Sequence, residues 1–243
     1  MTAVAGIYKW ELLKLRAQKR TYLGLGAAML VPIIFVTALA VKGHGNPNDI
    51  PLGRYIRATG LATPFVVLFF MSIWAFPLIT ALVAGDIVSS ETHNGTLKTI
   101  LTRSRDRGQI FLGKVLAVAT YTIVVVVAMA VVGTIAGIIE WGFKPLVSLS
   151  GTQVSASHGL GLLAATVGVY VLPLIGIAAF GLLLSTVTRN SAASVVGTLM
   201  WAYLAAVLDD MSLVIMWERW EGTIEHTLMT PVPRVVQDRK SVV

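Results

Sequence analysis

The sequence predicts an all-α integral membrane protein with five transmembrane helices. Of its 243 residues, 56% are hydrophobic and 13% are charged, whereas soluble domains carry about 25% charged residues. Five apolar stretches are long enough for a helix that crosses a bilayer, which needs roughly 20 residues. They lie at about 22–41, 60–85, 110–139, 160–187 and 191–210. A soluble fold of this size could not bury so much apolar surface, so the composition excludes a soluble enzyme.

Each stretch is expected to be helical, because a helix satisfies its backbone hydrogen bonds within one segment in lipid. The third stretch contains a β-branched run, Val124–Val127, but its length of about 30 residues far exceeds the roughly 9–11 residues of a barrel strand. Gly133 and Gly137 predict close helix packing, either within the chain or at a dimer face. Kinks that serve packing or act as hinges are predicted at Pro32, Pro64, Pro77 and Pro173.

Lys and Arg are distributed unequally between the two sides of the predicted bundle. One side has eleven, in residues 1–20, in the loop after the second stretch and at Arg189. The other side has four, which are Lys42, Arg54, Arg57 and Lys144. The positive-inside rule therefore predicts a multi-pass protein of the plasma membrane with its N-terminus in the cytoplasm.

Amphiphilic segments flank the five stretches. Residues 1–20 combine an apolar helical side with basic residues, which predicts a helix on the cytoplasmic membrane surface. At the other end, Met211–Trp217 is too short to cross, and Trp217 and Trp220 favour the headgroup level. Residues 211–243 are therefore predicted to form an outer-face segment, and no sixth span is visible.

No pattern typical of a catalytic, metal or cofactor site stands out. The absence of cysteine excludes thiolate metal sites and thiol catalysis. Gly108–Lys114 fits the phosphate-loop pattern G-x-x-x-x-G-K, but Val115 replaces the Ser or Thr that binds magnesium. The span cores lack the ionisable residues that mark proton or ion pathways, and Asp86 and Glu140 lie at span ends. The four histidines, His44, His93, His158 and His226, fall outside the spans.

The connection between the second and third spans, residues 86–114, is the most informative segment. Asn94 and Gly95 interrupt the backbone, after which a short cytoplasmic helix is predicted within 94–105. It would carry an apolar ridge and a basic flank, formed by Leu97, Ile100 and Leu101 and by Lys98, Arg103 and Arg105, respectively. Such a helix predicts a docking element. The alternative is a solvated loop whose charges only fix the topology.

This connection resembles the E-x-x-x-G-T-L … S-R … G-K signature of the type-2 ATP-binding-cassette permeases. The N-terminal segment Trp10–Lys14 is also similar to the amphipathic helix of that family. The chain departs from the family pattern in lacking Pro before Ser104-Arg105 and in showing five spans where six are common. The matching residues are Glu91, Gly95, Thr96, Leu97, Arg107, Gly113 and Lys114.

The resemblance implies the permease subunit of an ATP-driven exporter. The 94–105 helix would be a coupling helix seated in a separate ATPase subunit, and Glu91 would stiffen the connection that carries it. Leu97, Ile100 and Leu101 would fill an apolar socket, and Arg103, Arg105 and Arg107 would meet acidic groups or lipid phosphate. Two ATPase subunits and a second permease, identical or paralogous, would complete the unit. ATP and magnesium would bind the ATPase, so this chain is expected to have no cofactor, no enzymatic activity and no nucleic-acid partner.

Uncharged spans favour an amphiphilic cargo such as a drug, antibiotic, peptide or lipid. Met71, Trp74, Phe76 and Trp201 are candidate cargo contacts, with packing as the alternative role. An ion-coupled secondary transporter and a structural subunit of another membrane complex are the competing functions. The first predicts buried charge and internal repeats, and the sequence shows neither.

Overall fold

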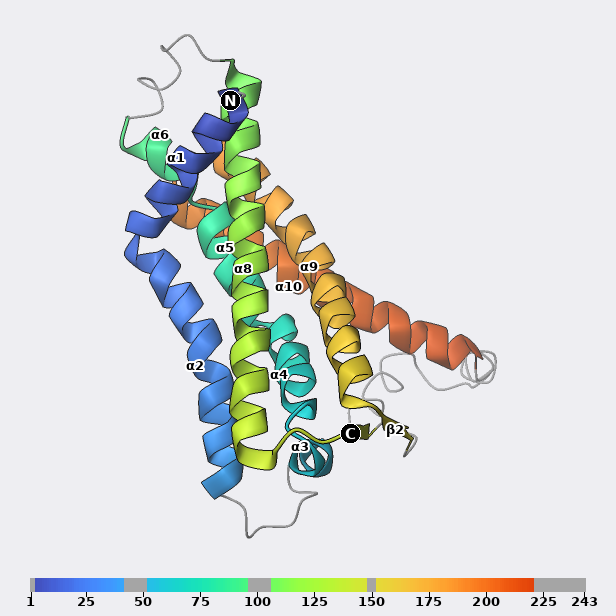
Figure 1. The fold of residues 1–243 in the computed structure, drawn as a ribbon. Coiled ribbons are helices and arrows are strands. Elements are labelled where there is room, and N and C mark those ends of the chain that lie inside the picture. The colour runs from blue at the N-terminus through green and yellow to red at the C-terminus, as the bar shows by residue number, and fades with distance from the viewer. Residues whose placement is uncertain (1–2, 42–51, 96–105, 148–151, 221–243) are drawn as a thin grey trace, which may run out of the picture. The chain divides into compact units, whose positions relative to one another are not determined.

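The computed structural model describes residues 3–41, 52–95, 106–147 and 152–220, and this part of the chain is nearly all helical (Figure 1). A two-stranded antiparallel hairpin pairs Leu146 with Val154. The elements in chain order are α1 (Ala3–Ala17), α2 (Lys19–Val41), α3 (Gly53–Ala58), α4 (Ala62–Ile73), α5 (Ala75–Ala84), α6 (Ser89–His93), α8 (Arg107–Trp141), β1 (Leu146–Val147), β2 (Gln153–Val154), α9 (Ala156–Val187) and α10 (Ser191–Trp220). The predicted all-α class is confirmed.

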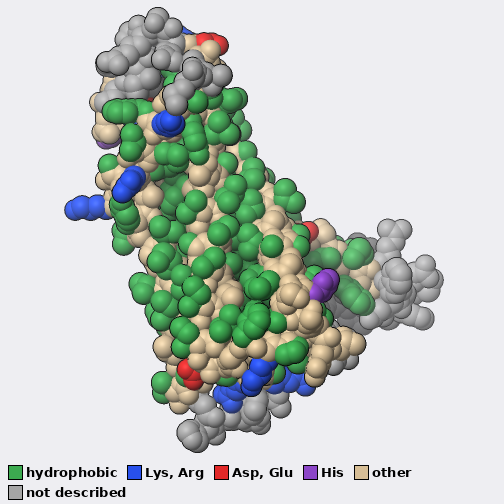
Figure 2. Space-filling model, in the orientation of Figure 1, with side chains coloured by type: hydrophobic (Ala, Val, Ile, Leu, Met, Phe, Trp, Pro, Cys, Tyr) green, Lys and Arg blue, Asp and Glu red, His purple; other side chains and the backbone are tan. Residues whose placement is uncertain are grey.

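Four helices are individually long and apolar enough to cross a membrane: α2, α8, α9 and the Ser191–Trp217 part of α10. α4 and the helical residues 75–93 that follow it form a pair that is bent by 58° and that has, taken together, the length and hydropathy of a fifth span. Hydrophobic side chains cover the face seen in Figure 2, and Lys and Arg side chains lie toward its two ends. The protein is therefore a membrane protein, and the five predicted stretches correspond to its helices.

The second span is broken at Trp74, whose backbone (φ −139°, ψ −40°) leaves the helical region. Pro77 explains the position of this break, because a proline lacks the N–H that would bond to the carbonyl four residues earlier and its ring clashes there. That carbonyl belongs to Ile73, the last residue of α4. The helical ladder begins again where the Leu78 N–H donates to the Trp74 oxygen at 3.2 Å.

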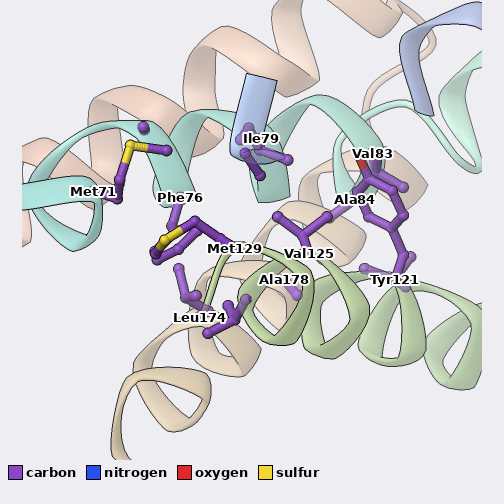
Figure 3. Packing of buried hydrophobic residues seen from close by; sticks show 14 of the residues in the cluster. Met71, Phe76, Ile79, Val83, Ala84, Tyr121, Val125, Met129, Leu174 and Ala178 are labelled. Carbon is purple, nitrogen blue, oxygen red and sulfur yellow. The ribbon is translucent and has the colours of Figure 1, made fainter. Parts of the chain in front are cut away.

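Residues 1–200 form one compact unit whose core surrounds α8. α8 contacts α1, α2, α4 and α9. Figure 3 shows Met71 and Phe76 of the broken span near Met129 of α8 and Leu174 of α9, all within one buried cluster. The cluster consists of apolar side chains of mixed size, as expected where helices must interdigitate.

Small residues allow the second and third spans to approach closely near the C-terminal end of α8, next to the hairpin. A Cβ added to Gly137 would overlap the Gly60 carbonyl oxygen and lie 2.5 Å from Thr63 Oγ1. Gly133 faces Pro32 and Pro64. The Gly60 N–H donates to the Gly142 oxygen at 3.1 Å. The glycine pair predicted from the sequence therefore serves packing within the chain.

Residues 201–243 form a second unit, of which the structure describes 201–220. The fifth apolar stretch was predicted to end at about 210, and the helix that contains it, α10, continues through Asp209, Asp210 and Met211 to Trp220. The acidic pair does not interrupt this helix, and the end of the membrane span within α10 stays a prediction. The segment 211–220 is accordingly the continuation of a long helix.

Candidate functional site

Four charged side chains from three helices form an ion network where α1, α6 and α8 meet. Lys114 Nζ lies 2.8 Å from a Glu91 carboxylate oxygen and 3.2 Å from a Glu11 oxygen. Lys14 Nζ lies 2.7 Å from Glu91 and 3.0 Å from Glu11. Each ammonium thus contacts both carboxylates, and the formal charges of the network cancel.

The network is largely removed from solvent. The side chain of Lys114 is 2% exposed and that of Glu11 is 5% exposed, whereas Lys14 is 28% exposed. Lys114 Nζ also donates to the Ile87 carbonyl at 3.3 Å. A buried charge is tolerated only when it is paired and hydrogen-bonded, and this arrangement meets both requirements.

Burial would lower the pKa of Lys14, but its hydrogen bonds to Glu91 and Glu11 and the charges of these carboxylates outweigh that effect. The pKa of Lys14 is therefore raised above its usual value of 10.5. Lys14 remains a cation at neutral pH, and so the network keeps both of its positive charges there.

The helix length places this network beyond the hydrocarbon layer. Lys114 and Trp141 are 27 residues apart on one helix, which corresponds to about 40 Å. The hydrocarbon core of a bilayer is about 30 Å thick, and tryptophan favours the headgroup level. With Trp141 at one surface, Lys114 lies beyond the opposite surface.

Gly113 allows α1 to approach α8 closely enough to complete the network. A Cβ added there would lie 2.6 Å from Ile7 Cγ2 and 3.3 Å from the Tyr8 backbone nitrogen. The hydroxyl groups of Tyr8 and Thr120 are hydrogen-bonded at 2.9 Å, which fixes the same two helices further along. The predicted motif residue Gly113 is thus a packing contact beside the network.

The structure describes some of the residues that were predicted to couple the chain to an ATPase. Glu91 lies in α6, and Gly95 follows that helix with a positive φ of 71°, a conformation that favours glycine. Arg107 is the exposed first residue of α8, after the Asp106 N-cap. Thr96, Leu97, Ile100, Leu101, Arg103 and Arg105 lie outside the described residues.

A second polar group lies at the turn between α5 and α6. Asp86, 4% exposed, forms an ion pair with Arg20 of α2 and accepts a hydrogen bond from the Ser191 hydroxyl of α10. Gly85 packs against this part of α10, since an added Cβ would lie 2.9 Å from Val195 Cα. The turn is therefore attached to the first and last spans of its unit.

Ser185 of α9 caps α6 from a different helix. Its buried hydroxyl oxygen accepts hydrogen bonds from the Val88 N–H at 3.0 Å and from the Ser89 N–H at 2.9 Å. The first N–H groups of a helix have no partner within the helix, and they are usually satisfied by a local side chain. Here α9 supplies that acceptor, so the start of α6 is bound to a membrane span.

The four candidate cargo contacts have different environments. Met71 and Phe76 are 2% and 1% exposed and belong to the core cluster. Trp74 is 55% exposed at the break in the second span. Trp201 is 40% exposed and belongs to the second unit. The packing role that the sequence left open therefore applies to Met71 and Phe76.

The phosphate-loop pattern at Gly108–Lys114 lies within the continuous helix α8, where its backbone N–H groups enter the helical ladder instead of wrapping an anion. Among the residues that the structure describes, no group of three or more His, Cys, Asp or Glu could hold a metal ion.

A family model described as a protein of unknown function, DUF2705, matches residues 52–223. The chain belongs to this family. No curated protein matches the chain. The DUF2705 match includes Glu91 and Lys114 but begins after α1, so it contains one half of the ion network. The family description assigns no activity to this arrangement.

The sequence alone did not reveal several residues that form polar contacts in this DUF2705 protein. Lys114 was counted with a basic cytoplasmic loop, although it is a buried residue of α8. Asp86 was noted only as a charge at a span end. Ser185 carried no signal, because a serine in an apolar helix usually bonds to its own backbone.

Proposed function

We propose that this chain is the transmembrane subunit of an ATP-driven exporter of amphiphilic cargo in the plasma membrane. Its N-terminus would face the cytoplasm, and the segment 94–105 would dock into a separate ATPase subunit. Two ATPases and a second permease would complete the assembly, and ATP and magnesium would bind the ATPases. The resemblance to type-2 ATP-binding-cassette permeases supplies this assignment, and the geometry of the ion network supports it.

The single observation that supports the proposal best is how the docking segment is held at both ends. Glu91 precedes the segment and Lys114 follows it, and the two side chains are paired at 2.8 Å. Both are also bound to α1 through Glu11 and Lys14. A solvated loop whose charges only fixed the topology would not require its flanking residues to be bound to each other. A segment that receives force requires such a rigid attachment.

The contacts of α6 provide a route for that force into the spans. Ser185 joins the start of α6 to α9, and Asp86 joins the preceding turn to α2 and α10. Discrete hydrogen bonds and ion pairs between rigid helices transmit displacement better than exposed loops do. Movement of the 94–105 segment would therefore reach three spans through direct contacts.

The docking role is tested by co-purification. The tagged chain is purified from the membranes of its own cells, and the ATP-hydrolysing protein recovered with it and the rate of hydrolysis are measured. The substitutions Leu97→Asp with Leu101→Asp place charge on the apolar ridge and are expected to reduce ATPase recovery at least tenfold. The matched control, Thr99→Asp with Thr102→Asp, adds the same charge away from the ridge. Equal recovery with both pairs would refute docking through this ridge.

The orientation is tested separately, and the absence of cysteine makes the test simple. Ser104→Cys and Ser150→Cys are labelled in intact cells with a membrane-impermeant maleimide. The proposal requires labelling at position 150 and protection at position 104 until the membrane is opened. Labelling of position 104 from outside would place the docking segment on the wrong side for a cytoplasmic ATPase.

A further inference from the structure

An apolar groove runs between α8 and α9 on the surface of the first unit. Its volume is about 390 Å³, and its lining comes only from these two helices. Thr134 is the one lining side chain with a polar group, and its hydroxyl donates to the Ala130 carbonyl at 2.7 Å. The side chains of the groove therefore offer no free hydrogen-bond donor to a ligand. The other lining residues are Val127, Ala130, Val131, Ile135, Leu160, Leu163, Ala164 and Val167.

The groove lies deep in the membrane, at a level that the far part of an acyl chain from the leaflet on the hairpin side can reach. From Val127 to Ile135 it extends about 12 Å along α8, and half of the hydrocarbon core is about 15 Å thick. It ends about 9 Å before Trp141, the last residue of α8, and Leu160 lies about 6 Å inside the start of α9. The end of the groove at Leu160 and Ile135 is therefore the end nearer to the hairpin.

Basic side chains gather at this end of the unit. Gly159, next to the groove residue Leu160, packs on Leu146 of β1, since an added Cβ would lie 3.7 Å from Leu146 Cβ. Lys144 is exposed two residues before Leu146, and its carbonyl accepts a hydrogen bond from Thr59 Oγ1 at 2.8 Å.

That hydrogen bond brings α3, which carries two further cations, close to Lys144. Arg54 and Arg57 lie on α3, and the neighbouring Ile56 belongs to a buried cluster that packs against Trp141 and Leu146. Figure 2 shows basic side chains at the corresponding end of the visible face. Within α8, Glu140 is the acidic residue at this end.

We propose that the α8–α9 groove binds one acyl chain of an anionic phospholipid, with the lipid phosphate held near Lys144. The apolar lining matches an acyl chain, and the basic end of the unit matches the headgroup charge. A polar cargo would leave most of its hydrogen-bonding groups unsatisfied in this groove, which disfavours its binding. The site is independent of any ATPase, so it stands or falls separately from the proposed export function.

The test uses vesicles of phosphatidylcholine that contain a small fraction of photoactivatable phosphatidylglycerol, with a diazirine in its acyl chain. A parallel sample carries the same diazirine chain on phosphatidylcholine. After irradiation, lipid adducts are mapped by mass spectrometry. We expect adducts on groove residues, with the anionic lipid preferred about fivefold, the factor that corresponds to about 1 kcal/mol for one basic residue near a membrane surface.

Matched variants separate the two halves of the site. Ala164→Phe fills the groove and should reduce adducts of both lipids at least fivefold, whereas Ala165→Phe, at an exposed neighbour outside the lining, should not. Lys144→Gln should remove the preference for the anionic lipid and keep the adducts, whereas Arg189→Gln should change neither.

Three outcomes would overturn the proposal. Equal adduct yields for the two headgroups would remove the anionic half of the site. An Ala164→Phe variant that labels like Ala165→Phe would remove the groove. Cross-links from Val131→Cys to a second copy, or to residues 201–243 of the same chain, would show a protein occupant instead of a lipid.

Discussion

Replacing Lys114 with methionine is the sharpest test of the ion network. Methionine keeps most of the side-chain volume and removes the charge. The change leaves Glu11 and Glu91 sharing only Lys14, and it removes the donor at 3.3 Å from the Ile87 carbonyl. Breaking a buried ion pair by removing one partner costs about 3–5 kcal/mol. Because Lys114 is 2% exposed, solvent cannot replace the lost contacts, and this range applies.

Lys14→Met is the matched control, since it removes the same charge from the same two carboxylates. Lys14 is 28% exposed, so water screens its contacts and the expected loss is about 1 kcal/mol. For a chain of this size 1 kcal/mol corresponds to about 2–4 °C in melting temperature. Lys114→Met should therefore melt roughly 4–16 °C below Lys14→Met in the same detergent, measured by tryptophan fluorescence or by size-exclusion after heating.

The pH dependence of Lys114→Met provides a second readout. Burial would raise the pKa of Glu91, but the charges and hydrogen bonds of Lys114 and Lys14 outweigh this effect and hold the pKa below its usual value of 4.5. The stability that this lowered pKa contributes is present above pH 4.5 and is lost as the pH falls below it. Lys114→Met removes much of this contribution, so its deficit relative to the wild type should shrink as the pH falls below 4.5. Equal melting temperatures for the two variants, or a deficit that does not shrink at low pH, would refute the buried network as described.

Two further substitutions test the helix contacts. Gly137→Ala should destabilise the folded chain by about 1–3 kcal/mol, because the new methyl group overlaps the Gly60 backbone. The control Gly133→Ala should be nearly neutral, because its Cβ would lie 3.5 Å from its neighbours. Equal shifts in melting temperature for the two variants would contradict the close approach at Gly137. Ser185→Ala leaves two buried N–H groups without an acceptor, at about 1–3 kcal/mol for each. Thr186→Ala, which removes an exposed hydroxyl bonded within its own helix, should have little effect, and faster amide exchange at the start of α6 in the first variant alone is the expected signature.

Much of the fold could be predicted from hydropathy. The five apolar stretches correspond to helices because the length needed to cross a bilayer is a property of each segment alone. Pro77 predicts that the second span is broken. It does not predict the size of the bend, which is 58°. α10 continues past the apolar stretch that ends at about 210, because Asp209 and Asp210 lower the local hydropathy without interrupting the backbone.

The polar contacts could not be predicted in the same way. Lys114 and Glu11 are separated by 103 positions in the sequence, and nothing local states that these two residues meet. The resemblance singled out Glu91 and Lys114 but gave a role to Glu91 alone, because a motif gives positions and not partners. Their pairing depends on the approach of α1 to α8 at Gly113, which is a property of the packed helices.

These contacts hold α6 at its start and at its middle residue, which leads to a last prediction about how it moves. Ser185 binds the N–H groups at the start of α6, and Glu91 binds the ion network. If α6 moves as a rigid element, loosening one attachment should change the cost of loosening the other. The double variant Ser185→Ala with Glu91→Gln should then deviate from additivity by at least about 0.5 kcal/mol in a double-mutant cycle of unfolding free energies. Pairing Thr186→Ala with Glu91→Gln supplies the control cycle. Additivity in both cycles would mean that the two attachments act independently, and α6 could not then transmit displacement from the docking segment to α9.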